Sequence, residues 1–296
     1  MKEKPFSKYQ ILANAVMIIW TLAIILPFIL LFMSSITDEN TLVANGYSFF
    51  PKKFSLASYS YIIKSGGQIL KAYGVSIGVT VVGTLLNVLL SALRAYPLSV
   101  KNLPGRNVMM FFVFFTMLFN GGIVPSYIMW TGTFHIKDTI FAQLLPNFLL
   151  SAWNVMMIRT YFTTSIPDGL YEAAEIDGAS QFTIFWKIVL PLGKPILVTM
   201  GTFAGLAYWN DWTNGLYYIV KNTGLYNVQN LLNQMVQNIQ FLTQSSNSNV
   251  TAAASTIPAT GIQMAIAFVA ILPIMLIFPS FQKYYAKGIA LGAVKG

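Results

Sequence analysis

Two short clusters in the sequence combine indole rings with amide and carboxylate groups. Aromatic rings pack against the apolar faces of sugar rings, whereas amides and carboxylates exchange hydrogen bonds with hydroxyl groups. In a cavity, these residue types would suit a neutral, polyhydroxylated solute. The candidates for such a substrate pathway are Asn147, Trp153, Asn154, Trp209, Asn210 and Asp211.

Each of these side chains also has a purely structural interpretation. Asparagine in a membrane helix commonly hydrogen-bonds a neighbouring helix. Tryptophan gathers at the membrane–water interface, which is the preferred interpretation for Trp130 and Trp212. For Asn154, Asn210 and Asp211 both interpretations stay open.

Motifs for catalysis and cofactor binding are missing from the sequence. There is no phosphate loop of the form GxxxxGK[ST], no cysteine, and a lone histidine, His135, with only Asp138 near it. We therefore expect no enzymatic activity, no metal and no cofactor bound by this chain. The apolar segments also lack the buried charges of ion-coupled carriers, so the energy for active transport would come from another subunit.

The composition indicates a polytopic helical membrane protein. Hydrophobic residues make up 55% of the chain and charged residues only 9%, against about 25% charged in typical soluble domains. Several apolar runs reach the roughly 20 residues that a helix needs to cross a bilayer. We expect an all-α fold, one transmembrane domain over residues 1–296, with six transmembrane helices over about 11–33, 72–93, 107–130, 140–162, 195–212 and 261–281.

The third of these spans contains Asn120-Gly121-Gly122 and Pro125, which predict a kink or a break in the helix.

The distribution of basic residues predicts the orientation. Of the 18 lysine and arginine residues, the larger group lies at the termini and in the connections after the second and fourth spans. By the positive-inside rule, that side is cytoplasmic. The basic residues assigned to it are Lys2, Lys4, Lys8, Arg94, Lys101, Arg106, Arg159, Lys187, Lys194, Lys283, Lys287 and Lys295. They are scattered singly and form no patch interleaved with aromatic residues, so we expect no nucleic-acid partner.

Residues Ser165–Pro191, called the elbow below, form a charged segment between the fourth and fifth spans. Ser165 and Asp168 predict a capping pair at the start of a short helix. Gly178 can adopt the left-handed conformation that ends a helix, and Ser180 can cap the next one. The elbow should therefore contain two short helices that meet at Gly178.

The second arm of the elbow has a helical apolar pattern. Phe182, Phe185, Trp186 and Val189 recur at three- and four-residue steps, which predicts a helix with one apolar face. Pro191 then marks the start of the next long segment.

The elbow also resembles a known family. Glu172-Ala173-Ala174 is followed by three residues, Gly178, nine residues, and then Ile188, one residue and Leu190-Pro191. This spacing resembles the EAA loop of permease subunits in binding-protein-dependent ABC importers. The Trp-Asn-Asp at residues 209–211 and the closing Lys287-Gly288-Ile289 look like the carbohydrate-uptake branch, similar to the maltose-type second permease.

The resemblance implies a type I ABC importer permease fold in a bacterial plasma membrane, with a cytoplasmic coupling helix. In that family a second permease completes a heterodimer, two cytoplasmic ATPase subunits use ATP and Mg, and an extracytoplasmic binding protein delivers the sugar, here an oligosaccharide. The coupling residues that it implies are Glu172, Ala173, Ala174, Asp177, Gly178, Ile188, Leu190 and Pro191.

Two other functions remain compatible with the sequence. An ABC permease for a non-sugar solute would keep the elbow but have a different cavity. A self-contained channel or ion-coupled carrier would need no ATPase, and the elbow would then be only an amphipathic connector.

Overall fold

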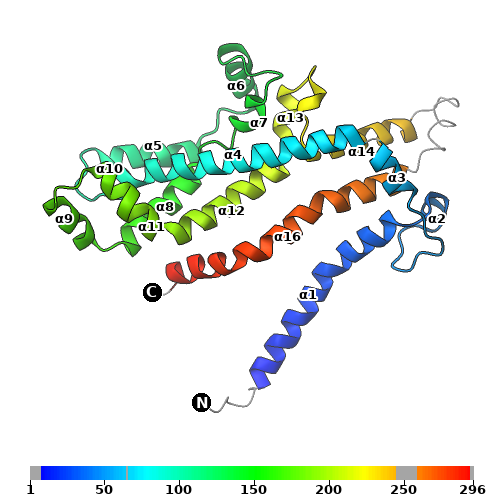
Figure 1. The fold of residues 1–296 in the computed structure, drawn as a ribbon, viewed down its shortest axis with the longest axis horizontal. Coiled ribbons are helices and arrows are strands. Elements are labelled where there is room, and N and C mark those ends of the chain that lie inside the picture. Colours follow the sequence, from blue (N-terminus) through cyan, green and yellow to red (C-terminus); the bar gives the residue numbers. More distant parts are fainter. Residues whose placement is uncertain (1–7, 65, 245–258, 294–296) are drawn as a thin grey trace. The chain divides into compact units, whose positions relative to one another are not determined.

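The structure is a computed structural model that describes residues 8–64, 66–244 and 259–293. Within those ranges the regular elements are helices, and an isolated bridge between Thr37 and Phe54 is the one β-type pairing. The chain divides into two compact units, residues 1–69 with 232–273 and residues 70–231 with 274–296. Figure 1 follows the elements along the chain.

The first unit contains α1 (Lys8–Ser35), α2 (Glu39–Asn45), α3 (Ala57–Lys64) and the first part of α16 (Ala259–Ala293). Helix α1 has 28 residues and includes Pro27. Large apolar side chains are exposed on all of its sides, including Trp20 and Leu22. A helix that is hydrophobic all round is typical of a membrane span.

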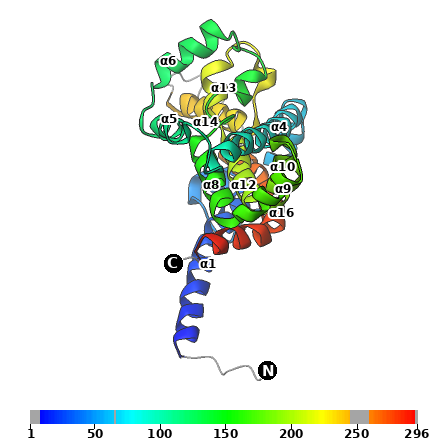
Figure 2. The ribbon, with the colours of Figure 1, turned by 90° about the vertical axis from the view of Figure 1, so that its left-hand side faces the viewer.

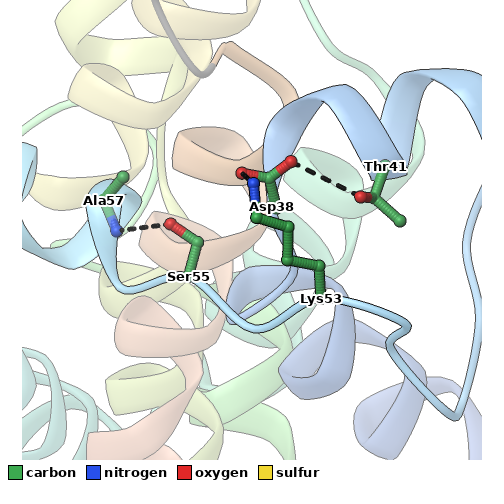
Figure 3. A network of polar contacts seen from close by, with 5 residues as sticks. All are labelled: Asp38, Thr41, Lys53, Ser55 and Ala57. Carbon is green, nitrogen blue, oxygen red and sulfur yellow. Dashed lines mark hydrogen bonds and ion pairs between the residues drawn. The ribbon is translucent and has the colours of Figure 1, made fainter.

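The connection between α1 and α3 is held by a polar network around Asp38 (Figure 3). Its carboxylate accepts a hydrogen bond from Thr41 and pairs with Lys53 Nζ at 3.4 Å. The Asp38 amide donates to the Lys53 carbonyl at 3.0 Å, and Ser55 Oγ accepts from the Ala57 amide at the start of α3. These bonds fold the loop back on itself between the two helices.

Glu39 links this loop to α16 within the same unit. Its two carboxylate oxygens accept from the amides of Thr260 and Gly261 at 2.9 and 2.8 Å. Free amides at a helix N-terminus favour a carboxylate, so Glu39 caps α16. Further along, the rings of Phe32 and Phe268 lie 4.9 Å apart.

The second unit begins in α4 (Gly66–Ser99), a continuous helix of 34 residues. Helix α5 (Arg106–Leu118) follows, and after a break come α6 (Ile123–Ile128) and a π-helical turn η1 (Met129–Thr133). The axis bends by 109° at the break. Gly122 there has φ +86° and its amide donates to Asn120 Oδ1, so the break predicted from Asn120-Gly121-Gly122 is confirmed.

The rest of the second unit consists of short helical elements and two longer helices, α8 and α12. After α7 (Phe141–Leu144) come α8 (Ala152–Ser165), α9 (Asp168–Ile176), α10 (Gln181–Ile184), the π-helical turn η2 (Phe185–Val189) and α11 (Leu190–Leu192). Helix α12 (Lys194–Asn210) is followed by α13 (Thr213–Tyr218), the 3₁₀ turn η3 (Thr223–Leu225) and the start of α14 (Val228–Gln244), which belongs to this unit only up to Leu231. Figure 2 shows α8 beside α12 from a second direction, and the two helices are in contact.

The core of the second unit lies between α8, the elbow and α4. Ile158 and Phe162 of α8 pack with Ile184, Phe185 and Val189, all at most 1% exposed. The axis turns by 78° between residues 181–192 and α12. Gly193 permits this turn, because a Cβ there would come within 2.5 Å of the Phe162 ring.

Three described helices are long and apolar enough to cross a membrane: α1, α4 from Gly67, and α16 over Thr260–Ile277. Two bent pairs bring the number to five if each is one span, namely α5 with α6–η1, and α10–α11 with α12. The predicted fourth span at about 140–162 coincides with α7 and with α8, which has only 14 residues. The mostly helical fold is as predicted, whereas the count of six spans stays a prediction.

Candidate coupling site and substrate pathway

The first arm of the elbow starts later than its predicted cap. Helix α8 continues through Ser165, and α9 begins at Asp168 after Pro167, without a side-chain cap. Ser165 cannot act as an N-cap for α9 because its own backbone is still helical in α8. The capping pair of Ser165 and Asp168 is therefore wrong, although the short helix itself is present.

The corner of the elbow forms at Gly178, as predicted. Gly178 has φ +74°, and the amide of Ala179 donates to the Ala174 carbonyl at 2.9 Å, which closes the end of α9. Ser180 Oγ then accepts from the Thr183 amide at 3.2 Å and caps α10. Both local predictions are confirmed, because a left-handed glycine and a serine cap need only neighbouring residues.

Helix α9 presents most of its polar side chains to the surroundings. Glu172, Ala173 and Asp177 are exposed, and Ile176 is 86% exposed. Ala174 is buried instead, at 8%, and packs on the core that contains Ile158 and Phe162. One EAA alanine therefore faces the core, and the other, about 100° further around the helix, faces outward.

The second arm carries the predicted apolar face, but the core of this chain covers only one edge of it. Phe185 and Val189 are buried in the core, whereas Phe182 and Trp186 are 67% and 45% exposed. Each pair is four residues apart and so forms its own stripe. Of the remaining candidates, Ile188 and Leu190 are half-buried against the core and Pro191 is exposed.

The pathway candidates on α8 point in different directions. Trp153 is 50% exposed, whereas Asn154 is 5% exposed and donates to Asn87 Oδ1 at 2.7 Å. Asn87, on α4, donates in turn to the Phe148 carbonyl at 2.6 Å. The Asn154 amide thus links α8 to α4, whereas the Trp153 side chain is exposed.

The candidates at the end of α12 also differ in how exposed they are. Asn210 is exposed, and Trp209 is buried at 7% with its ring 6.4 Å from that of Tyr73. Asp211 is 5% exposed, and its Oδ1 accepts from the Thr213 amide and hydroxyl and from the Asn214 amide. The Asp211 side chain therefore starts α13 by capping its free amides.

Asp211 belongs to a buried set of polar side chains that we call the amide network. Its members from the predicted pathway are Asp211 and Asn147, which donates to Asn214 Oδ1 at 3.3 Å. The remaining members were not predicted, and the complete set is Gln143, Asn147, Asp211, Asn214, Asn227 and Asn230. Asn147 is exposed, whereas the other members of the set are buried.

Long-range bonds hold this network together. Gln143 Nε2 donates to Asn230 Oδ1 at 3.2 Å and to the Leu225 carbonyl at 3.1 Å. Asn227 Nδ2 donates to the Asp211 carbonyl at 2.6 Å, and Asn230 Nδ2 to the Trp212 carbonyl. The sequence marked Gln143 and Asn147 only as amides within the predicted fourth span, and Asn214, Asn227 and Asn230 only as amides in the polar stretch after the fifth. Neither signal says which of them meet.

The Asp138 carboxylate stabilises the loop at residues 220–222. Asp138 Oδ1 accepts from the amides of Val220, Lys221 and Asn222 at 2.7, 2.8 and 3.2 Å. These backbone donors hold the pKa of the Asp138 carboxyl below its usual range, and the positive charge of Lys137 lowers it further. His135 is exposed nearby, and no cluster of three metal-ligating side chains exists among residues 8–64, 66–244 and 259–293.

Two curated relatives match the chain over almost their full lengths. Protein LplC of Bacillus subtilis (strain 168) is 36% identical over 272 residues, which covers 92% of this chain and 90% of that protein. The polygalacturonan/rhamnogalacturonan transport system permease protein YtcP of the same strain is 35% identical over 288 residues, covering 97% and 98%.

A solved structure matches the fold as well. It is the crystal structure of a bacterial ABC transporter involved in the import of the acidic polysaccharide alginate, with a TM-score of 0.79 and 26% identity. The match covers 95% of this chain and 100% of that chain. Residues 73–291, which include the elbow and the amide network, match the family described as the inner membrane component of binding-protein-dependent transport systems. The chain belongs to this family of ABC importer permease subunits.

Proposed function

We propose that this chain is the membrane subunit of an ATP-driven oligosaccharide importer and forms half of its translocation pathway. The exposed face of α9, with Glu172, Ala173 and Ile176, is the observation that carries this proposal. A short helix that turns polar and apolar side chains outward, on a rigid corner at Gly178, can dock into a separate subunit. The names of relatives that transport polygalacturonan, rhamnogalacturonan and arabinooligosaccharides support an oligosaccharide as solute.

The chain takes no part in hydrolysis in this proposal. Two cytoplasmic ATPase subunits use ATP and Mg, and their closure moves α9 and, through it, α8 and α12. Glu172 offers a charge to the ATPase, and the small side chain of Ala173 lets the ATPase approach the outward face of α9 closely. The buried Ala174 and the half-buried Ile188 and Leu190 transmit the movement to the core.

The remaining parts of the importer follow from the same proposal. A second permease completes a heterodimer, and a binding protein delivers the sugar on the side opposite the elbow. Residues 1–296 act as one transmembrane domain in a bacterial plasma membrane. Basic residues are concentrated at both termini and next to or within the elbow, at Arg159, Lys187 and Lys194, which supports a cytoplasmic location for all three.

The exposed members of the predicted pathway are the better candidates for contact with the solute. Trp153, Asn210 and Asn147 retain accessible surface, and indole and amide groups suit the ring faces and the hydroxyls of a sugar. Asn154, Trp209 and Asp211 would then support the wall of the pathway from behind.

Reconstitution of the purified complex in vesicles tests the proposal. We expect the chain to co-purify with a second permease and an ATPase, and oligosaccharides to stimulate ATP hydrolysis and to accumulate inside the vesicles. Transport by the chain without a bound ATPase would instead show a channel or carrier. Stimulation by amino acids or phosphate esters alone would refute the sugar part of the proposal.

A further inference from the structure

The end of α4 lies against both arms of the elbow. Tyr96, only 7% exposed, stacks on Tyr171 of α9 with ring centroids 6.5 Å apart and planes at 23°. The same ring lies 5.4 Å from that of Phe185 in η2, on the other side of the corner at Gly178. One side chain of α4 thus contacts the elbow before and after its corner.

A chain of side-chain hydrogen bonds continues from this ring across the corner. The Tyr96 hydroxyl donates to Gln181 Oε1 at 2.6 Å, and Gln181 Nε2 donates to Glu175 Oε1 at 2.9 Å. Glu175 is in α9 and Gln181 begins α10, so the two bonds bridge the angle between these helices. Gln181 and Glu175 are exposed and Tyr96 is buried, so the bond from the Tyr96 hydroxyl is the stronger link between this corner and α4.

Two other polar contacts lie near this bridge, one from the loop after α4 to the elbow and one from α8 to α4. Lys101 Nζ lies 2.5 Å from Asp168 Oδ2, but both side chains are 58% exposed, and exposed ion pairs contribute little. Arg159 Nε of α8 donates to the Leu98 carbonyl at 3.2 Å. The buried Tyr96 hydroxyl is therefore the contact whose loss should matter most.

Helix α4 extends the connection away from the elbow without a break. At its middle, Asn87 bonds to Asn154 and to the Phe148 carbonyl. Near its other end, Ser76 Oγ accepts from the Val228 amide at 2.8 Å, at the start of α14. The 20 residues from Ser76 to Tyr96 span about 30 Å at the rise of an α-helix. Displacement of α9 would therefore reach the region of the amide network through α4 as well as through α8 and α12.

We propose that Tyr96 and Gln181 are positioning residues that tie the elbow to α4, so that ATPase-driven movement of α9 also moves α4. This inference rests on the proposed coupling function of the elbow. Neither residue contacts the solute in this proposal. Both act by holding α9, α10 and α4 in one arrangement while the ATPase moves the elbow.

Tyr96→Phe tests the inference because it removes the hydroxyl and keeps the ring that packs on Tyr171 and Phe185. In vesicles that contain the whole importer, we expect the amount of oligosaccharide transported per ATP to fall about fivefold, the factor expected for one lost hydrogen bond. Complex assembly and ATP hydrolysis without solute should not change. Tyr61→Phe is the matched control, since the Tyr61 ring is 41% exposed in α3 and its hydroxyl has no hydrogen-bond partner in the described part of the chain.

Gln181→Leu supplies the second measurement, because it removes both bonds of the bridge. If the Tyr96 hydroxyl acts through Gln181, then Tyr96→Phe should have no further effect in the Gln181→Leu background. Full additivity of the two changes, or an unchanged ratio of transport to hydrolysis in Tyr96→Phe, would overturn the inference. Loss of assembly with an unchanged ratio would also overturn it, by showing a merely structural role. If the unsubstituted complex neither hydrolyses ATP in response to oligosaccharides nor transports them, the proposed function itself fails.

Discussion

The elbow and the amide network use polar residues in opposite ways. In the elbow, Glu172, Glu175 and Asp177 are exposed on or just after α9. In the amide network, Gln143 and Asn214 have no exposed surface, and Asp211 and Asn230 are each 5% exposed. Polar groups that remain exposed can meet a partner, whereas buried ones are occupied by bonds within the chain.

This difference implies different mechanical properties. The amide network joins segments that are far apart in the chain, such as Gln143 and Asn230, which are 87 positions apart. Buried hydrogen bonds between such distant segments hold them together and rigidify a structure. The elbow is joined to α4 by a few side chains near its corner, and its second arm packs on α8 through the apolar side chains of Phe185 and Val189. Such a region can move as one piece without breaking many bonds, as a coupling element must.

The largest effect should come from the corner of the elbow. Gly178→Val places a β-branched residue at φ +74°, a conformation that costs roughly 1–2 kcal/mol or more for such a side chain. The angle between α9 and α10 should change, and we expect oligosaccharide-stimulated ATP hydrolysis in vesicles to fall to the unstimulated rate. Membrane insertion, measured by the amount of protein in purified membranes, should stay the same.

Gly178→Asn is the control for this substitution. Asparagine tolerates the left-handed conformation, and a Cβ at this position would meet no atom within 4 Å. The asparagine variant should therefore keep most of its stimulated activity. Equal loss in both variants would mean that the exposed surface at Gly178, and not the backbone angle, is what the ATPase requires.

The next largest effect should come from the amide network. Asp211→Ala removes the acceptor for three donors at the start of α13. A buried donor left without a partner costs about 1–3 kcal/mol of stability. We expect a lower thermal unfolding temperature for the purified protein. Asp211→Asn keeps one acceptor oxygen and removes the charge from Oδ2, which has no partner among the described residues. It should unfold close to the unsubstituted protein, and a drop as large as that of the alanine variant would show that the charge itself is needed.

The sequence was informative where structure depends on neighbouring residues. Gly178 and Ser180 marked the corner of the elbow, and Asn120-Gly121-Gly122 marked the break after α5, because backbone conformation and capping are local. The predicted cap at Ser165 was wrong because α8 continues through this residue, and its local sequence does not show where α8 ends. The apolar pattern of the second arm could not tell which stripe would meet Ile158 and Phe162 of α8.

The polar contacts between distant segments could not be predicted in the same way. Asn154 was a pathway candidate, but its bond to Asn87, 67 positions earlier, was not predicted. The same holds for Tyr96 and Gln181, 85 positions apart. Which amides pair depends on the packing of whole helices, and one sequence carries no direct record of it. Whether the predicted pathway residues contact a solute stays a prediction.

A smaller effect should distinguish the exposed pathway candidates from the buried ones. Asn210→Ala removes an exposed amide, and the loss of one hydrogen bond to a solute corresponds to about a fivefold rise in the oligosaccharide concentration for half-maximal uptake. Asn154→Ala removes a buried amide and leaves Asn87 Oδ1 without its donor. We expect it to lower thermal stability and to leave that concentration unchanged. The opposite pattern would place Asn154 in the pathway and Asn210 outside it.

The smallest effect should be the pH dependence at Asp138, where a carboxylate shares the capping role of Asp211 but lies at the surface. Three backbone amides at residues 220–222 lower the pKa of Asp138 in the folded state below that of an unfolded aspartate, about 3.9. The stabilisation from these bonds is therefore fully present above that value and is lost as the pH falls through the lower folded pKa. Amide hydrogen exchange at residues 220–222 should speed up, relative to other loops, only below about pH 4, after correction for intrinsic rates. Asp138→Asn keeps an acceptor oxygen that does not titrate, so its relative exchange should not depend on pH in this range. Equal pH dependence in both proteins would assign the change to another group.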